Sequence, residues 1–300
     1  MSARCPADDA TWRAQPWLGT FVDIGAHAHS ERALAEGFNA AFAAIARVHR
    51  TLGGHDAKSE LVRVNRHAAL TCQAISADFR AVLACALALA ACSDGAFDPT
   101  VGGDLVALGL LPPLARHARG ATWRDVVLDE EGVLFKRPLV LDLNGIAKGY
   151  AVDCAIAALR DAGVTRACVN AGGDLRVFGS ATETVHVRTG GAQSMMLPLL
   201  KIRDGAVASS GYGGQRRRIR DRIVTPLIEP RARLPSMTTR TVTVVAPTCM
   251  VADALTKVVA LKGECAESVL ARYGAGAAIL SPAKGRWRCT RLPRIVGRDA

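Results

Sequence analysis

Three signatures of common catalytic and metal sites are missing from this 300-residue chain. The sequence contains no G-x-x-x-x-G-K-[ST] nucleotide loop and no G-x-S-x-G serine-hydrolase elbow. Nine cysteines are present, but none of them form a C-x-x-C pair, so we expect no zinc site. Their odd number and mostly apolar surroundings favour reduced core cysteines.

The chain also lacks a long apolar run. No segment reaches the ~20 uncharged residues of a membrane span. The VLACALALAAC run at 82–92 is too short and predicts a buried helix instead. The first 20 residues carry acids and no apolar core, so we expect no signal peptide and a cytoplasmic protein.

Nucleic-acid motifs are missing as well, although the formal net charge is +11. Such a charge attracts anionic partners, but a coding bias toward arginine explains it equally well. There is no basic heptad region, Cys/His finger or aromatic RNA-binding signature, so we expect no nucleic-acid partner. The Arg216–Arg222 run is read as a solvated basic loop or as a screen for a bound phosphate.

The elements that are present mix helices with hairpins. Apolar periodicity predicts the long helices, and alternation predicts the strands. The expected helices and strands are 20–28 (strand), 31–52 (helix), a short helix capped by Ser59, 77–92 (helix), 126–143 (hairpin), a helix ending near 162, 167–179 (strand, turn, strand), 184–188 (strand), 241–247 (strand), 249–261 (helix) and 276–281 (strand). Because there is no regular βαβ alternation, the sequence predicts an α+β fold, with mixed antiparallel sheets flanked by helices in a single large domain over 1–300.

The stretch LDLNGIAKGYAVD, residues 141–153, is the first candidate site. A predicted strand delivers Asp142, and Gly145 and Gly149 allow close backbone approach. Lys148 lies where a helix is expected to begin, so its ammonium and the free helical N–H groups could face one anion. The alternative is an ordinary strand-to-helix turn with a solvated lysine.

Three further stretches carry polar groups in suggestive patterns. NAGGD at 170–174 is a second glycine-rich turn. SDGAFDPT at 93–100 is either a helix-ending turn or a site in which Asp98 accepts from a ribose or base beside Phe97. ADALTK places Asp253 and Lys257 four residues apart on a helix, as a salt pair, a metal carboxylate or a phosphate grip.

Taken together, these stretches resemble the FAD:protein FMN transferase (ApbE-like) family over nearly the full chain. The matching blocks, in family order, are PWLGTFVDI, HDAKSELVRVN, SDGAFDPTV, LDLNGIAKGYAVD, VNAGGDLRVFG, AVASSG, LIEPRAR and VTVVAPTCMVADALTKVVALKG. The resemblance implies an α+β fold that binds FAD with its diphosphate near Mg²⁺. It also implies transfer of FMN to a threonine of an acceptor flavoprotein, with release of AMP.

The resemblance also implies roles for individual residues. It assigns Asp253 with the carbonyl of Gly145 to the metal. We predict that Asp253 and Lys257 take part in catalysis. The residues that it assigns to the cofactor are Leu18, His55, Ala96, Phe97, Asp98, Asp142, Lys148 and Ile228.

Two departures from the family pattern stand out. Where the family's H-I-I-D-P-R-T-G is expected, this chain reads PLIEPRAR, so Pro226 replaces the histidine and Glu229 replaces the aspartate. A proline has no proton to exchange, so the base that this histidine supplies is lost. Lys257 stands at the metal-binding threonine, which motivates the hypothesis that its ammonium, anchored by Asp253, takes part of the cation's role.

The leading prediction is therefore an FAD-binding FMN transferase. The first alternative is an FAD-binding protein without transfer activity, which serves electron transfer or cofactor storage. The second is an adaptor whose basic surface binds an acidic protein.

Overall fold

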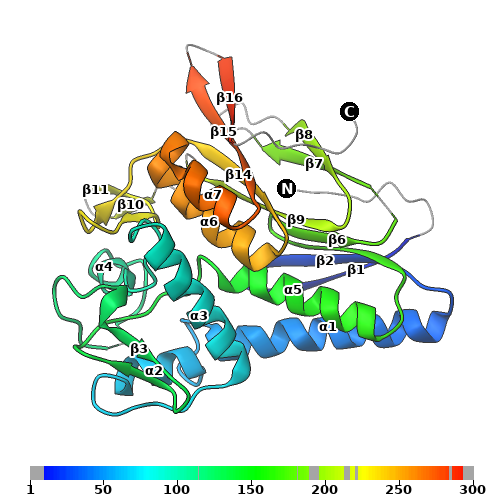
Figure 1. The fold of residues 1–300 in the computed structure, drawn as a ribbon. Coiled ribbons are helices and arrows are strands. Elements are labelled where there is room, and N and C mark those ends of the chain that lie inside the picture. The colour runs from blue at the N-terminus through cyan, green and yellow to red at the C-terminus, as the bar shows by residue number, and fades with distance from the viewer. Residues whose placement is uncertain are drawn as a thin grey trace. The chain divides into compact units, whose positions relative to one another are not determined.

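The computed structural model describes residues 10–113, 115–180, 182–188, 196–212, 217–219, 222–283 and 286–292. The chain divides into two compact units (Figure 1), which are treated one at a time below. Unit 1 comprises residues 1–49, 148–214 and 239–300, and unit 2 comprises residues 50–147 and 215–238. That residues 1–300 act as one domain stays a prediction.

Unit 1 is built on an eight-stranded sheet in the order β1-β2-β5-β6-β9-β14-β15-β16. All the neighbouring strands in it run antiparallel. The strands are β1 (Thr11–Trp17), β2 (Thr20–His27), β5 (Arg166–Ala171), β6 (Asp174–Phe178), β9 (Gly205–Gly211), β14 (Thr241–Ala246), β15 (Gly276–Ala283) and β16 (Arg286–Leu292). The sheet confirms the predicted α+β class.

Each face of this sheet has its own apolar cover. On one face, α1 (Glu31–Leu52) and α5 (Ala147–Asp161) bury Phe38, Ile45 and Ile156 against Val22 and Val169. The other face packs against the hairpin of β7 (Glu183–Arg188) and β8 (Met196–Ile202). Because successive strand side chains alternate between faces, Cys168 lies on the hairpin side and its neighbour Val169 on the helix side.

The helix α6 (Cys249–Lys262) follows β14 directly and is continued by η2 (Gly263–Ala266) and α7 (Glu267–Arg272). Thr248 caps it, accepting the N–H of Val251 at 3.4 Å. Most of α6 is buried, including the polar side chains of Asp253 and Thr256. None of the described helices combines the length and apolarity that crossing a bilayer requires.

Unit 2 contains short helices and two-stranded hairpins. Its helices are α2 (Glu60–His67), α3 (Ala77–Cys92), α4 (Gly102–Ala107) and the 3₁₀ turn η1 (Trp123–Asp125). Its strands pair as β3 (Val126–Leu128) with β4 (Val133–Phe135), β10 (Arg217–Ile219) with β11 (Arg222–Val224), and β12 (Ile228–Glu229) with β13 (Leu234–Pro235). The Ser59 cap is confirmed, since its hydroxyl accepts the N–H of Val62 at 3.1 Å.

Three expectations about unit 2 were wrong in detail. The predicted strand into Asp142 is an extended segment, whose only strand-like feature is a single bridge between Val140 and Val101. The hairpin near Gly132 therefore ends at Phe135 rather than at 143. The sequence reading also placed no helix where α4 forms.

The Arg216–Arg222 run lies partly outside the described residues. Its described part enters the β10–β11 hairpin instead of a loop.

Candidate functional site

The predicted site residues fall into both units. Leu18, Lys148, Asp253 and Lys257 belong to unit 1, whereas His55, Ala96, Phe97, Asp98, Asp142, Gly145 and Ile228 belong to unit 2. The structure brings Lys148, Asp253 and Lys257 together in one buried group. The unit 2 residues are described separately.

Lys148 lies in the first turn of α5, as the sequence predicted. Its ammonium forms an ion pair with the Asp174 carboxylate at the start of β6, which is almost fully buried. Burial lowers the pKa of Lys148, but the carboxylates of Asp174 and Asp253 outweigh it, so the net pKa is raised and the side chain stays cationic. Burial and the charge of Asp253 raise the pKa of Asp174 to about 6.

Gly149 follows Lys148 and lets α5 approach α6 closely. A Cβ at this position would lie 2.2 Å from the carbonyl oxygen of Cys249, a distance that no side chain permits. Its N–H donates to Oδ2 of Asp253 at 3.3 Å. The second glycine of the LDLNGIAKGYAVD stretch is therefore required by helix packing, and it places Lys148 next to the Asp253 carboxylate.

Asp253 and Lys257 form the second ion pair of the group, one turn apart on α6. The Asp253 side chain is 1% exposed and the Lys257 side chain 20%, so the carboxylate is sealed while the lysine side chain keeps some exposure. Burial lowers the pKa of Lys257, but the Asp253 carboxylate reverses this effect and the net pKa is raised. We call Lys148, Asp174, Asp253 and Lys257 the paired-charge cluster.

Hydroxyl groups lie beside this cluster. Thr256 shares a hydrogen bond with Ser210 on β9 at 2.9 Å and donates to the Asp253 carbonyl at 2.7 Å. The buried hydroxyl of Tyr212 lies beside Ser210 and Thr256, and burial raises its pKa. No role was predicted from the sequence for Thr256, Ser210 or Tyr212.

A third ion pair fixes the beginning of α6. Asp153 on α5 accepts the N–H groups of Cys249 and Met250, both at 2.9 Å, and pairs with Arg176 on β6. A carboxylate at a helix N-terminus satisfies donors that have no partner within the helix. No role was predicted for Asp153 from the sequence, because no local pattern shows which helix its carboxylate contacts.

In unit 2, Asp98 of the SDGAFDPT loop is held by Thr100 of the same loop and by Arg233. Its carboxylate accepts the N–H and the hydroxyl of Thr100 at 2.8 and 2.6 Å, and lies 3.8 Å from Arg233. Burial raises the pKa of Asp98, partly offset by these groups. Phe97 is also buried, with its N–H donated to Ser93 Oγ at 3.0 Å, whereas Ala96 is half-buried.

The remaining predicted residues differ in accessibility. His55 is exposed, and Asp142 is half-buried with its Oδ1 accepting the side-chain amide of Asn144 at 2.6 Å. Ile228 is buried in an apolar cluster with Leu105 and Leu111. In unit 1, Leu18 has a φ of +56° in the β1–β2 turn and packs partly on the core.

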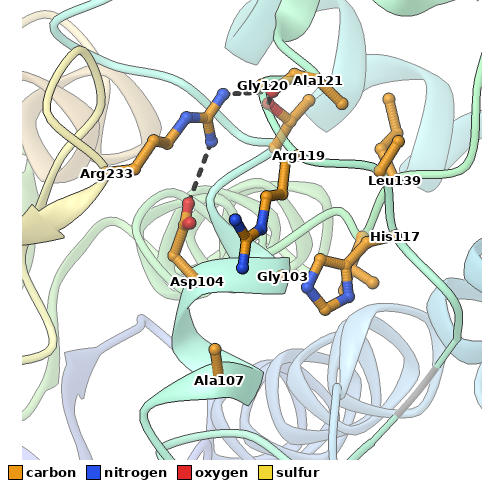
Figure 2. Close-up of a pocket in the computed structure, with 12 residues that line it drawn as sticks. Gly103, Asp104, Ala107, His117, Arg119, Gly120, Ala121, Leu139 and Arg233 are labelled. Atoms are coloured by element: carbon orange, nitrogen blue, oxygen red, sulfur yellow. Dashed lines mark hydrogen bonds and ion pairs between the residues drawn. The ribbon is translucent and has the colours of Figure 1, made fainter.

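Unit 2 also contains a cavity of about 320 Å³ that the sequence did not predict. It is lined by Thr100, Gly103, Asp104, Ala107, His117, Ala118, Arg119, Gly120, Ala121, Leu139, Val140 and Arg233. Figure 2 shows Arg233 bridging Asp104 and the Ala121 carbonyl at one rim, with Arg119 reaching toward Gly103. Arg233 thus joins the rim of the cavity to Asp98.

Comparison with known proteins adds a family and a fold. The family model described as the ApbE family matches residues 18–280. An FAD:protein FMN transferase of Chlamydia pneumoniae is 30% identical over 195 residues, covering 55% of this chain and 57% of the relative. One of Chlamydia trachomatis serovar D is 29% identical over 232 residues, covering 69% of this chain and 70% of the relative.

Two solved structures share the fold. The flavinyl transferase ApbE of Pseudomonas stutzeri, in its apo form, has a TM-score of 0.80 at 21% identity, covering 98% of this chain and 97% of its own. The ApbE protein of Thermotoga maritima has a TM-score of 0.81 at 23% identity, covering 95% and 97%. The family match spans most of the chain, so this chain belongs to the ApbE family.

Proposed function

We propose that this protein is an FAD:protein FMN transferase. The threonine oxygen of an acceptor flavoprotein attacks the FMN-side phosphorus of FAD, and the bond from that phosphorus to the AMP phosphate breaks. A phosphoester joins FMN to the protein, and AMP leaves with the electron pair of the broken bond. The threonine proton is lost to a base.

The paired-charge cluster supports this proposal most directly. Two ammonium groups, Lys148 and Lys257, are held at fixed positions by buried carboxylates, and both keep their charge. Phosphoryl transfer depends on cations that stabilise charge on the diphosphate as it is transferred. In a chain of the ApbE family, a diphosphate bridge is the anion that this cluster suits best.

The chain spans 57% of the length of the C. pneumoniae relative. The transferase activity of this chain and its acceptor flavoprotein are therefore both proposals. The residues proposed to hold the rest of FAD are Leu18, His55, Ala96, Phe97, Asp98, Asp142 and Ile228. Mg²⁺ at Gly145 and Asp253 and a cytoplasmic location are predictions of the family resemblance.

The test is covalent transfer. Purified protein is incubated with FAD and a threonine-bearing acceptor peptide, and the peptide mass and released AMP are measured together. We expect an added mass equal to FMN and one AMP per modified peptide. A valine-for-threonine peptide is the matched control. FAD retention without AMP release contradicts the proposal and favours an FAD-storage protein.

A further inference from the structure

The oxygens that a divalent cation needs at Asp253 are already in use. One carboxylate oxygen of Asp253 is bonded to the Lys257 ammonium, and the other accepts the Gly149 N–H at 3.3 Å. The Asp253 carbonyl accepts from both Lys257 Nζ, at 3.0 Å, and Thr256 Oγ1. A divalent cation at this carboxylate would therefore displace an ammonium or stand beside one.

Other ligands for such a cation are scarce. Within the described ranges, no group of three or more His, Cys, Asp or Glu side chains is arranged to hold a metal. The Thr256 hydroxyl, the nearest hydroxyl on α6, is shared with Ser210. Mg²⁺ is usually held by one or two carboxylates together with water and substrate phosphates. Here both carboxylates of the cluster are paired with ammonium groups, Asp253 with Lys257 and Asp174 with Lys148, so the residues present do not fit it.

Lys257 fits the position of a bound cation instead. Its anchor, Asp253, is 1% exposed and its own side chain 20%, so a sealed carboxylate fixes the ammonium of a side chain that is itself only partly buried. The pair of Lys148 and Asp174 has the same form, with 34% and 2% exposure. Two partly exposed lysine side chains, each paired with a sealed carboxylate, thus lie in one unit.

We propose that the Lys257 ammonium, held by Asp253, replaces the divalent cation in this chain, so that a phosphoric anhydride ligand is bound without metal. The inference rests on the proposed function for the identity of that ligand, FAD. The ammonium brings one positive charge where Mg²⁺ would bring two, and it donates hydrogen bonds to phosphate oxygens. Binding should therefore be insensitive to chelators and sensitive to Lys257.

The first measurement is the FAD dissociation constant, by isothermal titration in EDTA and again in Mg²⁺. We expect the wild type to give the same value in both buffers. Lys257→Met alone leaves a buried charge unpaired, so the test variant is the double Asp253→Asn/Lys257→Met, which is neutral at both positions. It should bind FAD roughly 10- to 100-fold more weakly in either buffer.

Lys262→Met removes a lysine charge from the last turn of the same helix, outside the paired-charge cluster, and should bind FAD like the wild type. Two results overturn the proposal: wild-type binding that chelator abolishes and Mg²⁺ restores, or a double variant that binds FAD undiminished.

The second measurement uses no flavin. The apo protein is titrated with Mn²⁺ and the free ion is followed by electron paramagnetic resonance. We expect no binding by the wild type in the micromolar range and a new site in Lys257→Thr, where a hydroxyl replaces the ammonium. Wild-type Mn²⁺ binding that Asp253→Asn removes overturns the proposal. If FAD binding is insensitive to chelator but no FMN is transferred, the replacement of the metal by Lys257 is supported and only the proposed transferase function is refuted.

Discussion

Arg176 and Asp153 lie 2.5 Å apart, from Nη1 to Oδ1, and through this pair strand β6 orients the carboxylate that caps α6. Both side chains are mostly buried, at 18% and 13% exposure. The same α6 carries Asp253 and Lys257, so the position of the paired-charge cluster depends on a contact that is separate from it.

Asp153→Ala should therefore lower the free energy of unfolding by about 2–4 kcal/mol, since it leaves Arg176 and two helix N–H groups without their acceptor. Chemical denaturation measures it. Glu36→Ala, which removes the exposed Glu36–Arg32 pair on α1, is the matched control and should cost under about 0.5 kcal/mol. Equal losses in the two variants would contradict the capping role of Asp153.

Gly149→Ala should be destabilising by about 1–3 kcal/mol, because the added methyl meets the backbone of Cys249 rather than a side chain that can turn away. Gly54→Ala is the control, since a Cβ there has its nearest neighbour at 4.0 Å. Thermal and urea unfolding of both variants compare them. A Gly149→Ala protein as stable as the wild type would show that α5 and α6 are not in close contact.

Arg233→Leu should cost about 2–4 kcal/mol, because Asp98 is buried and loses its cation. Its neighbour Arg231 pairs with Asp94 on the surface, at 73% and 64% exposure, so Arg231→Leu should cost under about 1 kcal/mol. Denaturant midpoints of the two variants give the comparison. A larger loss of stability in Arg231→Leu than in Arg233→Leu would refute the role of Arg233 as the cation that stabilises buried Asp98.

Asp98 should also make stability depend on pH. Burial raises its pKa above the ordinary 3.8, so the folded state binds the proton more tightly than the unfolded chain does. This contribution is complete below pH 3.8 and is lost as pH rises through the raised pKa. The wild type should therefore lose stability relative to Asp98→Asn over that interval, which urea titrations from about pH 3 to about pH 7 would measure. A difference in unfolding free energy between the two proteins that stays constant with pH would contradict the raised pKa of Asp98.

Neutralising the Lys148–Asp174 pair of the paired-charge cluster should weaken FAD binding. The double variant Lys148→Met/Asp174→Asn is neutral at both positions, so no buried charge is left alone. We expect its FAD dissociation constant to rise at least about tenfold, measured by quenching of flavin fluorescence. Lys148→Glu is the severe version, since it places a carboxylate beside Asp174 and Asp253. Undiminished binding by both variants would remove Lys148 from the site.

Long periodic segments were predictable from the sequence. The boundaries of α1 and α3 match the expected 31–52 and 77–92, because each helix buries one continuous apolar stripe. The β5–β6 hairpin follows from its glycine turn, with Gly172 and Gly173 at φ of +61° and +111°. The family resemblance, confirmed by the family match, came from the order of short motifs.

The partners of the charged residues were not predictable from the sequence. Lys148 meets Asp174, which is 26 residues away, and Asp153 meets Cys249, 96 residues away. Such pairs are fixed by how β6, α5 and α6 pack, and no local pattern encodes that. Asp253 and Lys257 were visible only because one helix turn separates them. The cavity beside Arg233 joins residues of four separate segments and has no linear signature.

The close crossing at Gly149 has a consequence for ligand recognition. Because α5 and α6 meet backbone to backbone, Lys148 and Lys257 cannot drift apart while the protein stays folded. The free-energy cost of holding these two like charges close together is therefore met during folding and not when the ligand binds. The part of the site formed by Lys148 and Lys257 is thus preorganised, and an anion binds there without a rearrangement of α5 and α6.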